Sequence, residues 1–356
     1  MPEALPDDYY YDAKTFAREP PANELPASFA PLYHSFAFES HKRANLHYLD
    51  EGGTLVFASG GIVHFLDLHT MTTSYLPCVS GNAVGCIEVH AERKLIAVCE
   101  KGTTPNVFLY EYPTFKLKRV LKNGTERAYS AANFSADGEM LVTVGSFPDF
   151  MMTVWDWNKE AIILRTKAFA QEIYRVNFSP RFEGQLVTGG MAHIRFWKMA
   201  QTFTGLKLQG EIGKFGKVEL SDINGYAELP DGKILSGSDW GNLLLWEGEL
   251  IKTEIRVSEK ENCHAGPIDV VILEGSTIIT GGGDGFIKIW PLKEIEGAEV
   301  TDEMPIFELK KPLKTVALGG TEAGRKAAHV VHMLRGDDHW IVQDSKGSVL
   351  KVNLDT

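Results

Sequence analysis

The sequence has no run of roughly 18 consecutive apolar residues, so it contains no stretch typical of a membrane-spanning helix. Its acidic, proline-bearing N-terminus does not resemble a signal peptide. The four cysteines have no CxxC spacing and no histidines at metal-ligand distance, which argues against a zinc site and a disulfide framework. Acidic residues outnumber basic ones by 47 to 36, and the net charge of −11 disfavours nucleic acid and anionic membranes as partners. We therefore expect a soluble intracellular protein without a metal site.

The sequence also lacks the short motifs of common catalytic and phosphate-binding sites. No G-x-S-x-G elbow occurs, so nothing marks an exposed serine nucleophile. The stretch from Gly319 to Lys326 has the glycine spacing of a P-loop. However, Arg325 stands where Lys is needed, and Lys326 stands where Ser or Thr would bind magnesium. No cofactor is expected.

The sequence does contain a recurring unit, and its pattern is clearest from His264 to Trp290. Apolar and polar residues alternate in three short runs, Ile268 to Leu273, Thr277 to Thr280 and Phe286 to Trp290. The turn Gly283-Asp284-Gly285 supplies residues that suit a tight reversal between antiparallel strands. This unit predicts a three-stranded meander.

Four residues of this unit have the spacing of a structural tetrad in a WD-type repeat: His264, Thr280, Asp284 and Trp290. A hydrogen-bonded chain through the histidine, the carboxylate, the hydroxyl and the indole N–H would satisfy buried polar atoms and hold one blade together. The same imidazole, carboxylate and hydroxyl can also be compared with a nucleophile triad. A peptidase-like hydrolase with a Ser/His/Asp site on the propeller is therefore the alternative function.

Weaker copies of the unit recur along the chain, aligned on the residue that ends the third strand. Five of the six intervals between these anchors are roughly 42 to 49 residues, close to the length of a WD repeat. The anchors are Leu66, Tyr110, Trp155, Trp197, Trp246, Trp290 and Val352. Seven such units predict an all-β, seven-bladed WD40 β-propeller that spans residues 32–356 as a single domain, and the 34 glycines fit its many turns.

The two ends of the chain depart from this pattern. Residues 1–31 are acidic and proline-rich and include three tyrosines from Tyr9 to Tyr11, so we predict a disordered or loosely packed arm. The last unit lacks a fourth strand, and we predict that Leu32 to Phe38 supplies it and closes the ring. An acidic insertion from Leu292 to Met304 predicts a loop or short helix on the rim.

Loops that join second to third strands, and fourth to first strands, are expected to share one face, which we call the loop face. Phe147 and Trp240 are aromatic residues in turns where small polar residues are typical, which suits interface anchors. The alternative is that each packs over a neighbouring blade. The partner-binding candidates on this face are Lys101, Arg127, Phe147, Asp149, Gln171, Met191, Lys217 and Trp240.

Several segments are more specific than a propeller requires. They are Thr104 to Pro113, Leu164 to Phe169, Thr202 to Gln209 (TFTGLKLQ), Gly225 to Asn242 (containing LPDGKILSGSDWGN) and Leu245 to Lys252. In these segments the chain resembles the N-terminal WD-repeat propeller of the cilia- and flagella-associated protein 44 family, over roughly residues 32 to 354. No catalytic, cofactor-binding or metal-binding residue is carried over by these motifs.

The resemblance implies a non-catalytic scaffold located in the cytoplasm, within the cytoskeleton of the cilium or flagellum, the axoneme. The family looks like large axonemal proteins of the tether and tether-head assembly, which links an inner-arm dynein motor domain to the doublet microtubule and regulates beating. Implied partners are the inner-arm dynein heavy chain, the paired cilia- and flagella-associated WD-repeat protein of the tether, and tubulin. Net charge disfavours acidic tubulin tails except at a basic patch of Lys311, Lys314, Arg325, Lys326 and Arg335. The chain is expected to be a monomeric fragment of a longer protein.

Overall fold

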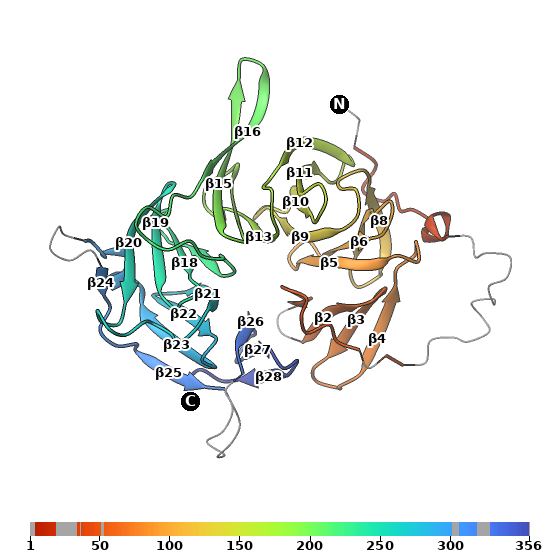
Figure 1. The fold of residues 1–356 in the computed structure, drawn as a ribbon. Helices are drawn as coiled ribbons and strands as arrows, with labels where there is room; N and C mark the ends of the chain where they lie inside the picture. The colour runs from red at the N-terminus through yellow and green to blue at the C-terminus, as the bar shows by residue number, and fades with distance from the viewer. Residues whose placement is uncertain are drawn as a thin grey trace.

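The computed structural model describes residues 4–18, 34–35, 37–50, 53–300, 306–318 and 328–355. Seven small sheets are arranged as blades around a central axis (Figure 1). Within each blade the strands follow one another in chain order and pair antiparallel, apart from one added strand. The predicted all-β, seven-bladed propeller is confirmed. No helix in the described ranges is long and apolar enough to cross a membrane.

The first four blades have four strands each. Blade one consists of β1 (Leu46–Tyr48), β2 (Thr54–Ser59), β3 (Ile62–Asp67) and β4 (Thr73–Pro77). Blade two consists of β5 (Ala83–His90), β6 (Leu95–Lys101), β7 (Val107–Glu111) and β8 (Lys116–Leu121). Blade three consists of β9 (Tyr129–Phe134), β10 (Met140–Gly145), β11 (Met151–Asp156) and β12 (Ala161–Lys167). Blade four consists of β13 (Ile173–Phe178), β14 (Gln185–Gly190), β15 (His193–Thr202) and β16 (Gly205–Ile212).

The last three blades are less regular. Blade five consists of β17 (Tyr226–Glu228), β18 (Ile234–Gly237), β19 (Leu243–Glu247), β20 (Leu250–Arg256) and the added β24 (Ile306–Glu308). Blade six consists of β21 (Ile268–Glu274), β22 (Thr277–Gly282), β23 (Phe286–Pro291) and β25 (Lys314–Ala317). Blade seven consists of β26 (Val330–Arg335), β27 (Trp340–Asp344) and β28 (Val349–Val352). The helices are η1 (Ala13–Phe16) and α1 (Leu292–Glu296).

The core lies between adjacent blades. Second strands such as β10 and β27 are buried on both faces, because neighbouring blades cover each side of the sheet. The outer strand β12 instead alternates between partly buried and exposed residues. This explains why second strands read as nearly continuous apolar runs in the sequence while outer strands do not.

The insertion after Trp290 forms a short helix and a strand. Helix α1 buries Leu292 and Ile295 in the core between blades five and six. The chain then adds β24 to the outer edge of β20, in parallel, with Ile306 opposite Glu254. The short helix was one of the two predicted forms, whereas the fifth strand of blade five was not predicted.

The predicted closing strand, Leu32 to Phe38, lies only partly within the described residues, and its described residues form no strand. Leu32, Tyr33 and Phe36 lie outside the described residues, and no strand of the described chain pairs with the outer edge of β28. The described part of the segment contacts blade one instead. The Ser35 N–H donates to the Tyr75 hydroxyl at 3.2 Å, and the Phe38 ring packs edge-on against Phe57.

Side chains join blades one and seven. The Tyr48 hydroxyl and His339 Nε2 are 2.9 Å apart, and His332 Nε2 lies 3.1 Å from the Leu46 carbonyl oxygen. Ile341 of blade seven packs against Leu46 and its neighbours in blade one. Burial and hydrogen bonding of these side chains therefore hold blades one and seven together.

The described part of the N-terminal arm, residues 4–18, is packed against blade two. Arg119 in β8 is fully buried, and its guanidinium donates hydrogen bonds to the carbonyl oxygens of Leu5, Pro6 and Tyr9 at 2.9 to 3.1 Å. The Tyr11 N–H donates to the Leu117 carbonyl, which extends the outer edge of β8 by one bridge. Residues 4–18 nevertheless remain partly or fully exposed, and the disordered or loosely packed arm over residues 1–31 stays a prediction. The predicted boundary at residue 31 lies outside the described residues.

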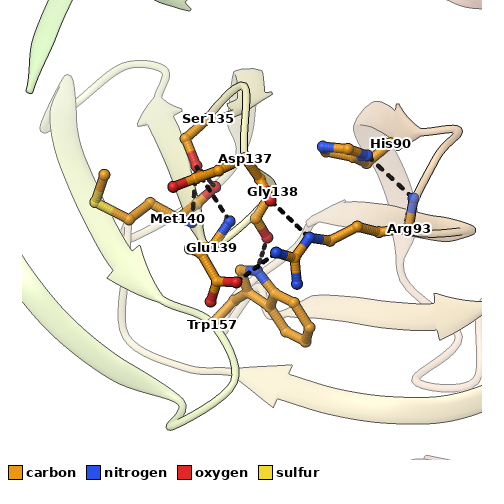
Figure 2. A network of polar contacts seen from close by, with 8 residues as sticks. All are labelled: His90, Arg93, Ser135, Asp137, Gly138, Glu139, Met140 and Trp157. Atoms are coloured by element: carbon orange, nitrogen blue, oxygen red, sulfur yellow. Dashed lines mark hydrogen bonds and ion pairs between the residues drawn. The ribbon is translucent and has the colours of Figure 1, made fainter. Parts of the chain in front are cut away.

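Turns on the face opposite the loop face also connect blades. Figure 2 shows Arg93, in the turn between β5 and β6, reaching to the turn of blade three that contains Asp137 and Glu139. Its Nε donates to the Asp137 carbonyl at 2.6 Å. The buried Trp157 indole donates to the Gly138 carbonyl at 2.8 Å, so the same turn is also tied to its own blade.

Candidate functional site

The four residues of the predicted tetrad lie in one hydrogen-bonded chain inside blade six. Thr280 is on β22 and Trp290 on β23, while His264 and Asp284 come from the loops that precede β21 and β23. The Trp290 indole N–H donates to Thr280 Oγ1 at 2.8 Å, and Thr280 Oγ1 lies 2.7 Å from His264 Nε2. His264 Nδ1 lies 2.9 Å from Asp284 Oδ1.

The pKa shifts of His264 and Asp284 indicate which atoms donate the hydrogen bonds in this network. Burial lowers the pKa of His264, although the hydrogen bond and charge of Asp284 oppose it. Burial alone would raise the pKa of Asp284, but hydrogen bonds from His264 and from the backbone N–H groups of Ala265 and Phe286 lower it to about 2. A neutral imidazole therefore donates from Nδ1 to a carboxylate and accepts the Thr280 O–H at Nε2.

This arrangement holds the blade and offers no nucleophile. Thr280 and Trp290 are fully buried, and the Thr280 hydroxyl has the histidine on one side and the indole on the other. A nucleophile triad needs an exposed hydroxyl next to a pocket for the substrate carbonyl. His264, Asp284 and Thr280 are thus arranged as a structural network.

Three other blades contain only the hydrogen bond between the tryptophan and the hydroxyl, without the histidine and carboxylate of blade six. The indoles of Trp155, Trp197 and Trp246 each donate to a hydroxyl on the second strand, those of Thr143, Thr188 and Ser236, at 2.9 Å. In blade four, His193 stacks on Phe169 with ring centroids 3.7 Å apart. Each of blades three to six is therefore stabilised by its own tryptophan, and blade six adds the histidine and the carboxylate.

On the loop face, four predicted partner-binding residues lie around the junction of blades two and three. Lys101 bridges to Ala128, and the Gly102 N–H donates to the Arg127 carbonyl at 2.8 Å, so these two loops run side by side. The side chain of Phe147, in the next loop, is 70 % exposed and touches Phe150 only edge-on. Phe147 therefore does not pack over a neighbouring blade.

Asp149, the fourth of these residues, is occupied within the protein. Its carboxylate accepts hydrogen bonds from the Thr125 hydroxyl at 2.8 Å and the Glu126 N–H at 3.1 Å. Asp284 accepts from the Ala265 N–H in the same way in blade six. This geometry favours a structural role for Asp149 over a role in partner binding.

The other candidates lie further around the same face. The Met191 N–H donates to the Glu172 carbonyl at 2.9 Å, which places Met191 beside the neighbouring Gln171. Both side chains are exposed. Lys217 is exposed in the long connection between blades four and five. Trp240 is half-buried, and its carbonyl accepts from Asn262 at 2.7 Å. The structure therefore spreads the eight candidates along an arc and does not gather them in one pocket.

Sequence reasoning missed a segment that crosses the middle of the loop face, residues 39–44. The Arg43 guanidinium lies 3.7 Å from the centroid of the Tyr174 ring in blade four, and its Nε donates to Asn224 at 3.2 Å. Lys42 donates to the Val84 carbonyl of blade two at 2.7 Å. The segment therefore links blades one, two and four. Its only sequence signal was a short basic run, His41 to Arg43, in a stretch that looked like a linker.

Below this segment lies a central cavity of about 430 Å³, lined by the first strands of the blades. Burial raises the pKa of Glu88 to about 8 and lowers the pKa values of His47 and His332 to about 4, so all three are biased toward their neutral forms. The described residues contain no group of three or more His, Cys, Asp or Glu side chains arranged to hold a metal ion. The residues 319–327 that include the P-loop-like stretch lie outside the described ranges.

Comparisons with known proteins agree with this architecture. Residues 81–331 match the family model described as the echinoderm microtubule-associated protein first beta-propeller. Over 99% of its length, the chain is 42% identical to cilia- and flagella-associated protein 44 of Mus musculus. It is 50% identical to cilia- and flagella-associated protein 44 of Chlamydomonas reinhardtii over 69% of its length. The chain spans only 19% and 14% of these two relatives, respectively.

More distant similarity extends to the microtubule-associated members. The chain is 27% identical to human echinoderm microtubule-associated protein-like 4 over 81% of its length, which corresponds to 31% of that relative. Among solved structures, the computationally designed Ika8 protein aligns with a TM-score of 0.57 at 15% identity, covering 87% of this chain and 95% of the designed one. At that identity the likeness concerns the fold alone.

Proposed function

We propose that the chain is a non-catalytic protein-interaction scaffold of the axoneme. It belongs to the echinoderm microtubule-associated protein family of beta-propellers, and over nearly its whole length it is similar to cilia- and flagella-associated protein 44. One structural observation carries this proposal. The polar residues that resemble a catalytic site are buried and bonded to one another, while the apolar side chain of Phe147 is exposed on a loop. Exposed aromatic residues on a rigid frame favour recognition of another protein.

A finer assignment follows from the resemblance. We place the propeller in the tether and tether-head assembly, where it contacts an inner-arm dynein heavy chain and the paired WD-repeat protein and so influences beating. The net charge of −11 supports protein surfaces that are neutral or basic as its partners. The similarity of nearly the whole chain to a protein named for cilia and flagella supports the cilium or flagellum as its location.

Tubulin is the least supported of the proposed partners. Within the basic patch, Lys314 Nζ donates to the carbonyl oxygens of Leu354 and Asp355 at 2.6 and 3.0 Å. Arg335 lies over the Trp340 ring and 3.6 Å from a Glu274 carboxylate oxygen. Arg325 and Lys326 lie outside the described residues. Two of the three described basic residues of the patch, Lys314 and Arg335, therefore already contact other groups of this protein.

A capture experiment tests the loop face. The full chain, as wild type or as Phe147→Ala or Trp240→Ala, is immobilised and incubated with solubilised axonemes, and bound proteins are identified by mass spectrometry. We expect either variant to lose one specific axonemal protein that the wild type retains, because the deleted ring is an interface anchor. Circular dichroism and thermal unfolding show that the variants are folded.

Met71→Ala is the matched control, since Met71 is 68% exposed in the turn between β3 and β4 on the opposite face. It is expected to leave capture unchanged. If the Phe147 and Trp240 variants also capture the same proteins as the wild type, the interface lies elsewhere on the propeller. Capture of no axonemal protein by the wild type would overturn the scaffold proposal for this chain.

A further inference from the structure

The hairpin of β15 and β16 in blade four is longer than a propeller blade requires. Its register runs from Arg195 opposite Ile212 to Thr202 opposite Gly205. It projects beyond the rest of its blade, as the upper green hairpin in Figure 1 shows. Its tip residue, Phe203, is fully exposed. The tip and the start of β16 are the TFTGLKLQ segment, which the loop-face function does not use.

The outer edge of β16 is available for pairing. No strand in the described ranges pairs with it, so β16 presents an open sheet edge, although its Gly210 carbonyl accepts a hydrogen bond from the Arg195 guanidinium at 3.1 Å. Open edges are usually protected by proline or dense charge, but β16 has no proline and exposes Leu206 and Ile212. Such an edge suits a partner that adds a strand.

Two other blades of the same molecule accept an added extended segment at this position. The outer strand of blade five, β20, pairs with β24 in parallel from Glu254 to Arg256. The outer strand of blade two, β8, receives the Tyr11 bridge of the N-terminal arm. Outer-edge pairing is therefore geometrically compatible with this propeller, and in blade four the position is vacant in the described chain.

A groove next to the hairpin offers a place for a side chain of the added strand. It is a cavity of about 250 Å³ between blades four and five, on the side opposite the loop face. Phe196 and Trp246 form apolar walls, Lys198 and Gln209 border the groove from the hairpin, and Glu211 and Glu228 line its inner part. Strand addition gains affinity from the backbone and specificity from pockets for alternate side chains, which this arrangement provides.

Charge indicates what kind of strand fits. Lys207 and Gln209 are two residues apart on β16 and so share a face, and Lys198 lies opposite Gln209. Lys198 and Lys207 are both exposed, and neither forms an ion pair with a residue in the described ranges. The only acid of β16 is Glu211, nearer the base of the hairpin. The outer half of this face is therefore basic in a chain whose net charge is −11.

We propose that the outer edge of β16 binds an extended, acidic segment of a partner protein by strand addition. Acidic side chains of that segment lie beside Lys198 and Lys207, and an apolar side chain enters the groove at Phe196. Phe203 covers the end of the added strand at the hairpin tip. This site is separate from the loop face, because turns between third and fourth strands lie at the opposite end of each blade.

Binding of synthetic peptides tests this proposal. The probes are two fluorescein-labelled peptide pools with Thr at every second position; the positions between carry one Val, Ile or Phe and otherwise either Glu and Asp or Lys and Arg, so that the apolar and charged side chains share one face. We expect the acidic pool to bind the full chain and the basic pool to bind at least about ten-fold more weakly. Hydrogen–deuterium exchange is expected to slow at residues 205–212 in the presence of the acidic pool, because added-strand bonds protect edge amides.

Two variants locate the binding. Lys198→Glu combined with Lys207→Glu is expected to weaken binding of the acidic pool about ten-fold and to favour the basic pool. Lys351→Glu, on the exposed strand β28 of blade seven, is expected to leave binding of both pools unchanged. Loop-face capture by the double variant is expected to stay intact, so the two proposals fail independently. The proposal is overturned by absence of acidic-pool binding at about 1 mM, by protection elsewhere, or by equal binding of both pools. Dimers that the double variant abolishes would also overturn it, because a second copy would then be the occupant.

Discussion

Blades six and four have the same strand order but use their polar residues differently. In blade six, His264, Asp284, Thr280 and Trp290 satisfy one another in the interior. In blade four only the Trp197 to Thr188 bond remains, and residues that depart from the repeat form a projecting hairpin with Phe203 at its tip.

This difference separates two uses of sequence in one fold. Residues that determine the fold are buried and partnered, so their removal leaves cavities or unsatisfied groups. Residues suited to recognition are exposed, like Phe203, or have no ion-pair partner in the described chain, like Lys198 and Lys207. If this division holds, substitutions in blade six change stability and substitutions in the hairpin change binding.

The largest expected effect is that of Trp290→Ala. Trp290 is fully buried among the apolar residues between blades five and six and donates to Thr280. We expect it to lower the free energy of unfolding by about 3–5 kcal/mol. Chemical denaturation monitored by circular dichroism measures this change. A loss as small as that of a surface substitution would contradict the structural role of blade six.

Thr280→Val and Thr188→Val compare the two blades directly. In blade six the change removes the partner of both Trp290 and His264, so we expect a loss of about 1–3 kcal/mol. In blade four it leaves only the Trp197 N–H unpaired, and a loss of about 1 kcal/mol is expected. Urea midpoints of the two matched variants decide the order. Equal losses would mean that the histidine adds nothing to the chain.

The same blades should differ in their response to acid. The folded-state pKa of Asp284, about 2, is below its unfolded value of 3.8, so its carboxylate contributes stability that is present above pH 3.8 and is lost as pH falls through 2. We therefore expect the stability difference between wild type and Asp284→Asn to shrink from pH 5 to pH 2. The Thr188→Val difference serves as control and should not change, because neither partner titrates there. A constant Asp284→Asn difference would rule out an ionised Asp284 carboxylate as the partner of the neutral His264 imidazole.

The smallest effect is expected for Phe203→Ala. Its side chain is fully exposed, so the free energy of unfolding should change by less than about 0.5 kcal/mol. Differential scanning calorimetry against wild type measures this. A large destabilisation would show that the hairpin tip packs on the propeller, and would remove the contrast between blades four and six.

Much of this architecture could be predicted from local spacing. The tetrad was visible because its four residues lie within one repeat. The anchors Trp155, Trp246 and Trp290 each lie next to the last residue of a third strand, whereas β15 continues past Trp197 to Thr202. Features that depend on distant residues could not be predicted. The arm is ordered by Arg119, which lies more than 100 residues away in the chain and carries no local signal for this contact.

The partner-binding candidates were only partly predictable for a similar reason. Because Phe147 was predicted to lie in a loop, its exposure could be expected. The hydrogen bond that Asp149 accepts from Thr125, which lies in another loop, could not. The crossing of the loop face by Arg43 depends on Tyr174 and Asn224, which come from another blade. Likewise, β24 joins blade five although it follows blade six in sequence, and alternation alone cannot assign a strand to a sheet.

The contacts of Arg119 also bear on the order of events during synthesis. Residues 4–18 leave the ribosome before blades two and three, but the guanidinium that binds Leu5, Pro6 and Tyr9 also donates to Asn158 in blade three. Translation at roughly 5–20 residues per second separates Tyr9 from Asn158 by about 8–30 s. During that interval the tyrosine-rich segment remains undocked and accessible to chaperones. Residues 4–18 therefore reach their final position only after the second blade, and part of the third, have emerged.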